Sequence, residues 1–170
     1  MLVSAASIYN AFLDERPDLL RYLFDPICTD RRGEIPTGMK PYFQIPVFTW
    51  FHGYLNVMYQ RQYINSAQRF SDAMHLTQNH IQALDTFDKF ANNTKLNLKM
   101  MLEPGDIQFV HNHTILHDRE RFQDWPEPKR KRHLLRLWLS VPGDRPLPDC
   151  FAERFGTTTI GNRGGIRVQN

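Results

Sequence analysis

Cysteine is scarce in this 170-residue sequence, and long apolar runs are absent. The two cysteines, Cys28 and Cys150, lie far apart and form no Cys-x-x-Cys pair. This excludes a disulfide-stapled mini-protein and a thiolate zinc site, and it fits a reducing compartment. No apolar stretch approaches the roughly 18–20 residues of a membrane-spanning helix, and the first residues lack the basic region of a signal peptide. We therefore expect a soluble, cytoplasmic protein with no membrane partner.

The sequence also lacks a large excess of either positive or negative charge. Twenty-one Lys and Arg residues oppose eighteen Asp and Glu residues, and the net charge of +3 is too small to predict binding to nucleic acid. The 41% of hydrophobic residues indicates a globular chain rather than a disordered one. The length predicts a single domain over residues 1–170.

Two segments have the apolar spacing of amphipathic helices. The first covers residues 7–24, where Pro17 interrupts or restarts the pattern. The second begins after Thr77, a residue that can cap a helix, and ends at residues 92–93. Its predicted buried stripe consists of Ile81, Leu84, Phe87 and Phe90, with Ala83 and Ala91 beside it.

The other patterned segments are short and typical of strands. Residues 27–46 contain turn-forming residues and predict a long loop or hairpin. Residues 47–50 and 54–59 predict paired strands around a tight turn at His52 and Gly53. Further strands are predicted at 96–101, 107–112 and 134–141, with a turn at 103–106 and a loop-rich tail over 142–170. This order favours an α+β fold with mainly antiparallel strands, a sandwich or barrel, rather than a doubly wound sheet.

Three histidines lie within seven residues: His111, His113 and His117. In a strand over 107–112 the side chains of His111 and His113 would share one face, and His117 would follow the strand end. Neutral imidazole is a common ligand for iron, zinc, copper and nickel, so the cluster is a candidate metal site. The alternative is that each histidine is an ordinary surface or hydrogen-bonded core residue.

Arg136 stands inside the apolar stretch 134–141. A guanidinium buried there without a partner would cost several kcal/mol, so we expect an anion beside it, either the carboxylate of a small ligand or a structural Asp or Glu. The preceding basic run, residues 129–132, is typical of a solvated loop.

The stretch from Leu102 to His117, followed by Arg132-His-Leu-Leu-Arg136, resembles the C-terminal half of the taurine dioxygenase (TauD/TfdA) family. The resemblance rests on a Pro-Gly-Asp turn, a strand ending in Asn112, a histidine a few residues later and an Arg-x-x-x-Arg motif. It extends back through residues 46–68 to the opening helix, and so covers nearly the whole chain.

The resemblance implies an Fe(II)- and 2-oxoglutarate-dependent dioxygenase on a double-stranded β-helix, the clavaminate-synthase-like jelly roll, with two flanking helices. His117 matches the distal iron ligand and Arg136 the arginine that binds the far carboxylate of 2-oxoglutarate. Such a site would take a small-molecule substrate and O₂, because a 2-His-1-carboxylate triad leaves three positions open on iron. Residues expected near these groups are Asn112, His113 and Arg132, and Tyr59, Arg61 and Tyr63 are candidates for the substrate side.

The sequence departs from the family at the proximal iron-binding motif, His-x-Asp/Glu. None of the seven histidines is followed two residues later by a carboxylate. We therefore expect the chain to be the C-terminal portion of a catalytic domain and the jelly roll to be incomplete. The missing half would come from a longer protein or a partner, or the chain is a decayed remnant. Alone, the chain is expected to bind iron poorly, to be inactive and to aggregate.

Two other readings remain open. A cupin-like metal site would use His111, His113 and His117 together, although the later cupin motif is absent. A non-catalytic interaction module would use the basic run at 129–132 to bind polyanions. The aromatic residues Trp125 and Trp138 lie outside that run in the sequence.

Overall fold

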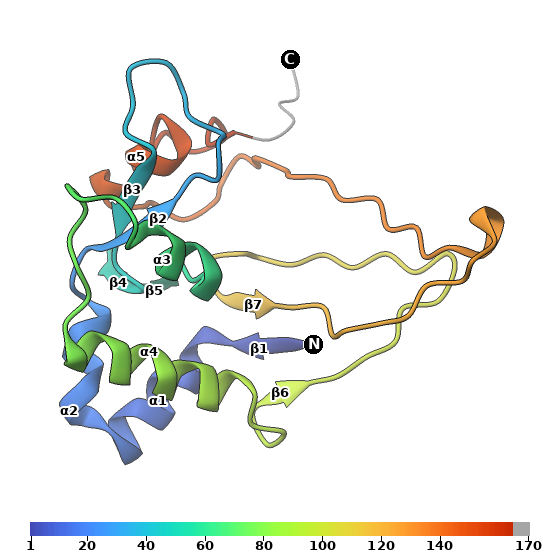
Figure 1. The fold of residues 1–170 in the computed structure, drawn as a ribbon, viewed down its shortest axis with the longest axis horizontal. Coiled ribbons are helices and arrows are strands. Elements are labelled where there is room, and N and C mark those ends of the chain that lie inside the picture. The colour runs from blue at the N-terminus through green and yellow to red at the C-terminus, as the bar shows by residue number, and fades with distance from the viewer. Residues whose placement is uncertain (165–170) are drawn as a thin grey trace.

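The computed structural model describes residues 1–164. The α-helices lie on one side of the molecule, and long extended segments project from the other side as an open arm (Figure 1). The helices and short helical turns are α1 (Ala5–Glu15), α2 (Pro17–Leu20), η1 (Arg21–Leu23), α3 (Arg61–Ala67), α4 (Gln78–Ala91), η2 (Pro128–Arg130), η3 (Asp149–Phe151) and α5 (Ala152–Phe155). No helix among residues 1–164 is long and apolar enough to cross a membrane.

The predicted helices are confirmed, and their ends follow from local chemistry. Pro17 splits the first predicted helix into α1 and α2. Proline has no backbone NH to donate, and it is tolerated at the first position of α2 because an NH there would have no acceptor within the helix. In α4 the Thr77 side chain accepts a hydrogen bond from the backbone NH of His80, whose own side chain accepts one from the Thr77 backbone NH. This reciprocal capping box satisfies two backbone donors that would otherwise lack partners.

Within residues 1–164, seven short strands pair in three separate antiparallel sheets. The hairpins are β2 (Ile27–Asp30) with β3 (Tyr42–Ile45) and β4 (Phe48–Phe51) with β5 (Tyr54–Val57). The third sheet has β1 (Leu2–Ser4) between β6 (Asn97–Leu98) and β7 (Ile115–His117). Both predicted hairpins are confirmed. In the second hairpin His52 and Gly53 have φ of 49° and 80°, the positive values that a two-residue type I′ turn requires.

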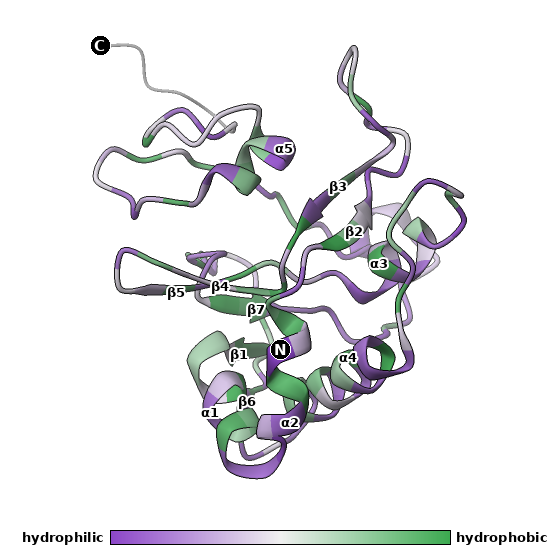
Figure 2. Cartoon of the chain, turned by 90° about the vertical axis from the view of Figure 1, so that its left-hand side faces the viewer, coloured by the Kyte–Doolittle hydropathy of each residue, from purple (hydrophilic) through white to green (hydrophobic). Residues whose placement is uncertain are grey.

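The main core lies between the helices and the β4–β5 hairpin and is rich in aromatic rings. Phe12 of α1 meets Phe90 of α4 edge to face, with centroids 5.0 Å apart, and Phe48 of β4 lies 5.6 Å from Phe87. The amphipathic character of α1, α2 and α4 is visible as alternating hydrophobic and hydrophilic patches along each ribbon (Figure 2). Most of the stripe predicted for α4 is buried, namely Ala83, Leu84, Phe87 and Phe90.

Two predicted strands are wrong. Residues 107–112 and 134–141 run in extended conformation without joining any of the sheets formed by residues 1–164. Their apolar side chains are largely exposed: Ile107 and Phe109 at 79% and 83%, and Leu135 at 82%. A strand needs a hydrogen-bonded neighbour along its length, and in these segments the described chain shows only a single isolated bridge, at Leu139. The strand predicted at 96–101 is reduced to the two residues of β6.

The α+β class and the antiparallel pairing are therefore as expected, but the described residues form no closed sheet, so the jelly-roll barrel stays a prediction. The predicted turn at 103–106 forms, with the NH of Asp106 donating to the carbonyl of Glu103. In the predicted tail, the short helices η3 and α5 interrupt the loop over residues 142–164, and residues 165–170 lie outside the described part of the chain.

Candidate functional site

His117 is the last residue of β7, and not a residue beyond a strand end as the sequence pattern predicted. It lies opposite Leu2 of β1, the strand that holds β7 on one side. The imidazole is exposed at the surface of the described residues. Partial burial, followed by the positive charge of Arg136, lowers the pKa of His117. The side chain is therefore held toward the neutral form, which is the form that binds metals.

Arg136 is exposed, so the expectation of a buried guanidinium with an anionic partner is wrong. The reason is the missing strand at 134–141: without a covering neighbour, this part of the chain stays in solvent and the guanidinium pays no desolvation cost. Within residues 1–164 no ion pair involves Arg136. Its positive charge nevertheless contributes to the lowered pKa of His117.

The turn before β7 carries the other two histidines, and they have different surroundings. The Nε2 atom of His111 lies 2.9 Å from Oδ1 of Asp144. The imidazole of His113 is packed among Phe151 and Phe155, and burial lowers its pKa to about 4. Its Nδ1 atom is buried without a hydrogen-bond partner.

These three histidines do not form a metal site. Among residues 1–164 no three His, Cys, Asp or Glu side chains come together in an arrangement that could hold a metal ion. The cupin-like reading, which needs all three imidazoles on one ion, therefore has no support in this geometry. The family resemblance assigns one iron ligand, His117, to the described residues, so a 2-His-1-carboxylate set is not complete within them.

The remaining candidates near the iron site are on the surface. Asn112 is exposed in the turn between His111 and His113. Arg132 is exposed as well; its backbone NH donates to Oδ1 of Asp124 at 2.8 Å and its guanidinium lies over the ring of Phe122. Neither residue touches His117 through a hydrogen bond in the described chain.

Tyr59 and Arg61 belong to an ion-pair network between the start of α3 and the exposed side of α4. Arg61 contacts Asp85 at 2.6 Å and Asp88 at 2.9 Å, and the hydroxyl of Tyr59 donates to Asp88. Burial, reinforced by the charge of Asp88, raises the pKa of Tyr59. Tyr63 lies apart, beside the guanidinium of Arg32, and lines a cavity of about 30 Å³. The structure thus gives Tyr59 and Arg61 a role in packing, and it does not bring either of them to His117.

The basic run at 129–132 is a solvated loop, as predicted, and part of it forms η2. The structure adds a feature that the sequence spacing concealed: the chain folds back so that the guanidinium of Arg130 stacks 3.4 Å above the ring of Trp125. A ring of this kind stabilises an exposed cation. Polyanion binding by the run stays a prediction.

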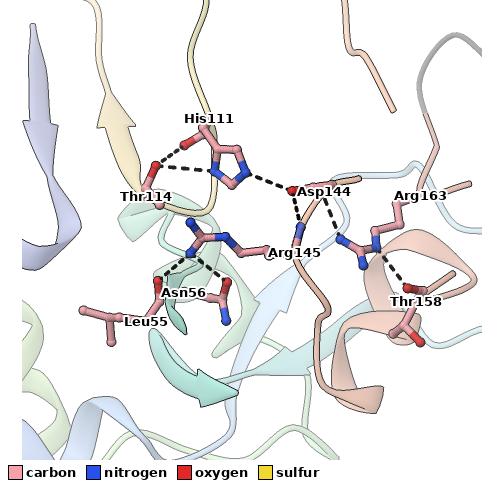
Figure 3. Close-up of polar contacts among 8 residues, drawn as sticks. All are labelled: Leu55, Asn56, His111, Thr114, Asp144, Arg145, Thr158 and Arg163. Carbon is pink, nitrogen blue, oxygen red and sulfur yellow. Dashed lines mark hydrogen bonds and ion pairs between the residues drawn. The ribbon is translucent and has the colours of Figure 1, made fainter. Parts of the chain in front are cut away.

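A polar cluster around Asp144 was not predicted from the sequence. It joins the His111 turn to the chain that follows Arg136, and it is drawn in Figure 3. Its members are His111, Thr114, Asp144, Arg145, Thr158 and Arg163, with contacts to Leu55 and Asn56. No local spacing signals such a cluster, because Asp144 lies 33 residues from His111 and 19 from Arg163.

Comparison with known proteins identifies the family. The model of the taurine catabolism dioxygenase TauD, TfdA family matches residues 1–138, which is most of the chain. The chain belongs to the TauD/TfdA family. The family resemblance is thereby confirmed, and its oxygenase character applies to the family as a whole.

Two curated TauD/TfdA-like relatives show how much of such a protein this chain represents. It is 34% identical over 160 residues to FR-33289 synthase of Streptomyces rubellomurinus, covering 91% of this chain and 47% of the relative. It is 35% identical over 154 residues to the taurine hydroxylase-like protein SAT17 of Stachybotrys chartarum, covering 84% of this chain and 38% of that relative. The chain therefore spans about half the length of these relatives or less.

Proposed function

We propose that this chain supplies the distal iron ligand, His117, and the co-substrate anchor, Arg136, of an Fe(II)- and 2-oxoglutarate-dependent oxygenase. The observation that carries the proposal is the family match, which spans residues 1–138 and so includes both side chains. Arg136 lies 19 residues beyond His117 in the sequence, and its positive charge contributes to the lowered pKa of the imidazole. With iron, 2-oxoglutarate and O₂ bound, such a site supplies the oxidising power to hydroxylate a small-molecule substrate while the co-substrate is decarboxylated.

The roles of the two side chains follow from their chemistry. A neutral imidazole donates a lone pair to a metal, and the lowered pKa of His117 keeps that lone pair free at neutral pH. The guanidinium of Arg136 is permanently charged and can bind a carboxylate through two parallel hydrogen bonds. It has no carboxylate partner among residues 1–164, so it is available to a ligand.

The second histidine and the carboxylate of the iron site would come from polypeptide other than the described residues. We place that polypeptide against the exposed apolar arm. A groove of about 260 Å³ lies at the base of the arm, lined by Leu2, Val3, Ser4, Leu96, Leu98, Phe109, Val110 and Ile115. Extended backbone with exposed apolar side chains is a suitable edge for added strands. Closure of the jelly roll would then bury the same surface that carries His117 and Arg136.

An anaerobic titration of the native gene product with Fe(II) and 2-oxoglutarate tests the proposal. We expect a saturable charge-transfer absorption that is lost in His117→Ala. Arg136→Gln should weaken 2-oxoglutarate binding about 10- to 100-fold, the value of a hydrogen bond to a charged group at roughly 1.5–3 kcal/mol. His75→Ala is the matched control, because His75 is exposed and distant in sequence. An absorption that is unchanged in His117→Ala would overturn the assignment.

The 170-residue chain alone should give no such absorption, since it provides one ligand of three. A saturable signal from the isolated chain, lost in His117→Ala, would show that the additional polypeptide is not needed. The intact mass of the native product decides between a longer chain and a separate partner as the source of the missing ligands.

A further inference from the structure

Asp144 joins two parts of the chain that carry the proposed site residues. Its Oδ1 atom lies 2.9 Å from Nε2 of His111, and its Oδ2 atom lies 3.3 Å from Nη1 of Arg163 (Figure 3). The backbone NH of Arg145 also donates to Oδ1, at 2.7 Å. We call His111, Asp144 and Arg163 the Asp144 clamp.

The clamp is shielded from solvent on its C-terminal side. The Arg163 side chain is only 5% exposed and that of Asp144 20%. Burial alone would raise the pKa of Asp144, but hydrogen bonds from His111 and from the Arg145 backbone hold it below its ordinary value. Arg163 is fixed in turn, because its Nε donates to the carbonyl of Thr158 and its backbone NH donates to Oγ of Ser140. A charged, hydrogen-bonded contact of this kind is stronger than a fully exposed ion pair.

His111 is connected to His117 through a short turn and the strand β7. The hydroxyl of Thr114 donates to the carbonyl of His111, and the carbonyl of Thr114 accepts from the NH of Ala5 at the start of α1. The next residues form β7, which ends at His117. The position of the His111 side chain is therefore linked through a short, hydrogen-bonded turn to the strand that bears the proposed iron ligand.

On the other side of the clamp, the chain between Arg136 and Asp144 makes few hydrogen bonds of its own. Residues 133–138 make no backbone hydrogen bond to another described residue. The fixed points on either side are Arg132, whose NH is bound by Asp124, and Ser140 to Asp144 at the clamp. The course of this segment is thus set by its ends, Arg132 and Ser140, each four residues from Arg136, and Asp144 follows eight residues beyond Arg136.

We propose that His111 and Asp144 are positioning residues that set the separation between the His117 strand and the Arg136 segment. This inference rests on the proposed function for its catalytic meaning: an anchor and a ligand act on one co-substrate only when their spacing is fixed. The residues act through His117 and Arg136 and touch neither.

The test measures the separation directly. Spin labels are attached to Asp118→Cys and Leu135→Cys in the native protein with its own cysteines replaced, since both positions are exposed neighbours of the two site residues. Pulsed electron-spin measurements then give the distribution of distances between the labels. His111→Ala is the main variant, because the His111 side chain is 43% exposed and its truncation leaves the core intact.

We expect His111→Ala to widen the distance distribution about twofold, as a segment released at one end samples more positions. His111→Gln keeps a side-chain NH that can donate to Asp144 and should restore the narrow distribution. Asp144→Ala should widen it as well. Asp72→Ala, which breaks the exposed Lys40–Asp72 pair elsewhere, is the matched control and should change nothing.

A distribution in His111→Ala that matches the parent protein overturns the inference, and so does an equal widening in Asp72→Ala. If Asp144→Ala fails to fold, His111→Ala and His111→Gln still decide the matter. The measurement needs neither iron nor 2-oxoglutarate. A failure of the proposed function would appear in the titration of the parent protein, whereas a failure of this inference would appear in the label distances.

Discussion

The imidazole of His113 lies edge-on to the ring of Phe151, with the two ring centroids 5.6 Å apart. Phe155 closes the other side at 6.0 Å, and the Nδ1 atom of His113 is buried without a partner. An imidazole in such surroundings is held neutral, and burial lowers its pKa to about 4. His113 therefore packs against the aromatic rings as a neutral side chain, and its protonation lowers the stability of the fold.

The first prediction concerns acid. The folded-state pKa of His113 lies below the unfolded value of 6.5, so the unfolded chain binds the proton more readily. The contribution to stability is complete above pH 6.5 and is lost as the pH falls toward 4, by about 3 kcal/mol in all. His113→Leu should remove this contribution to the loss of unfolding free energy in acid. At pH 7 the same substitution should lower the unfolding free energy only slightly, since it also removes a buried nitrogen without a hydrogen-bond partner. Urea unfolding at pH 7.5 and 4.5 measures the difference.

His75→Leu is the control for that experiment, because His75 is exposed. It should lose as much stability on acidification as the parent protein. Equal acid sensitivity in His113→Leu and the parent would show that the imidazole is not held neutral by burial.

The second prediction separates the two carboxylates that contact Arg61. Asp88 is the less exposed, at 38% against 61% for Asp85, and it also accepts the hydrogen bond of the Tyr59 hydroxyl. Asp88→Ala removes the side-chain acceptor of the buried Tyr59 hydroxyl and one of the two carboxylates that Arg61 contacts, and should cost about 1–3 kcal/mol of unfolding free energy. Asp85→Ala should cost less than about 1 kcal/mol, as is usual for a surface pair. Similar losses in the two variants, measured by urea unfolding, would contradict this account.

Local signals in the sequence predicted much of the fold. The capping residue Thr77, the interruption at Pro17 and the turn at His52-Gly53 each act within a few residues, so their structural consequences can be read from short windows. The predictions of strands at 107–112 and 134–141 are wrong because β pairing depends on a neighbour that is often distant in the chain. Alternating apolar residues indicate what a segment would do beside a partner, and the described residues provide no such partner.

For the candidate site too, the sequence indicates the residues that belong to a local motif, and it does not indicate the contacts between distant segments. His117 and Arg136 come from the family motif, and their roles in the site stay a prediction. The burial of Arg136 was inferred from apolar neighbours in sequence, and it fails because Leu135 and Leu137 are themselves exposed. The Asp144 clamp has no sequence signature, since its three members come from positions 111, 144 and 163 and meet only through the folded chain.

The third prediction concerns the start of α4. Thr77→Ala removes the side-chain acceptor of the capping box and should cost about 1 kcal/mol of unfolding free energy. Thr77→Ser keeps the hydroxyl and should stay within a few tenths of a kcal/mol of the parent. Urea unfolding followed by far-ultraviolet circular dichroism measures both variants. An equal loss in the two would mean that the methyl group of Thr77, and not its hydroxyl, stabilises this end of the helix.

The last prediction concerns the apolar arm. Leu135 is 82% exposed in the described chain, and a large apolar side chain in water favours association. In the isolated 170-residue chain, Leu135→Lys should therefore reduce self-association without lowering the unfolding free energy by more than about 0.5 kcal/mol. Leu13→Lys, at a 48% exposed position on α1, should leave self-association unchanged because it lies outside the arm. Sedimentation velocity over a concentration series gives the association state.

If the native product is longer and covers the arm, Leu135→Lys in that protein should instead lower stability by about 1–3 kcal/mol, because a charge then enters a buried apolar contact. Opposite effects of one substitution in the two proteins would identify the arm as the surface that the additional polypeptide covers, and a neutral effect in both would contradict that placement.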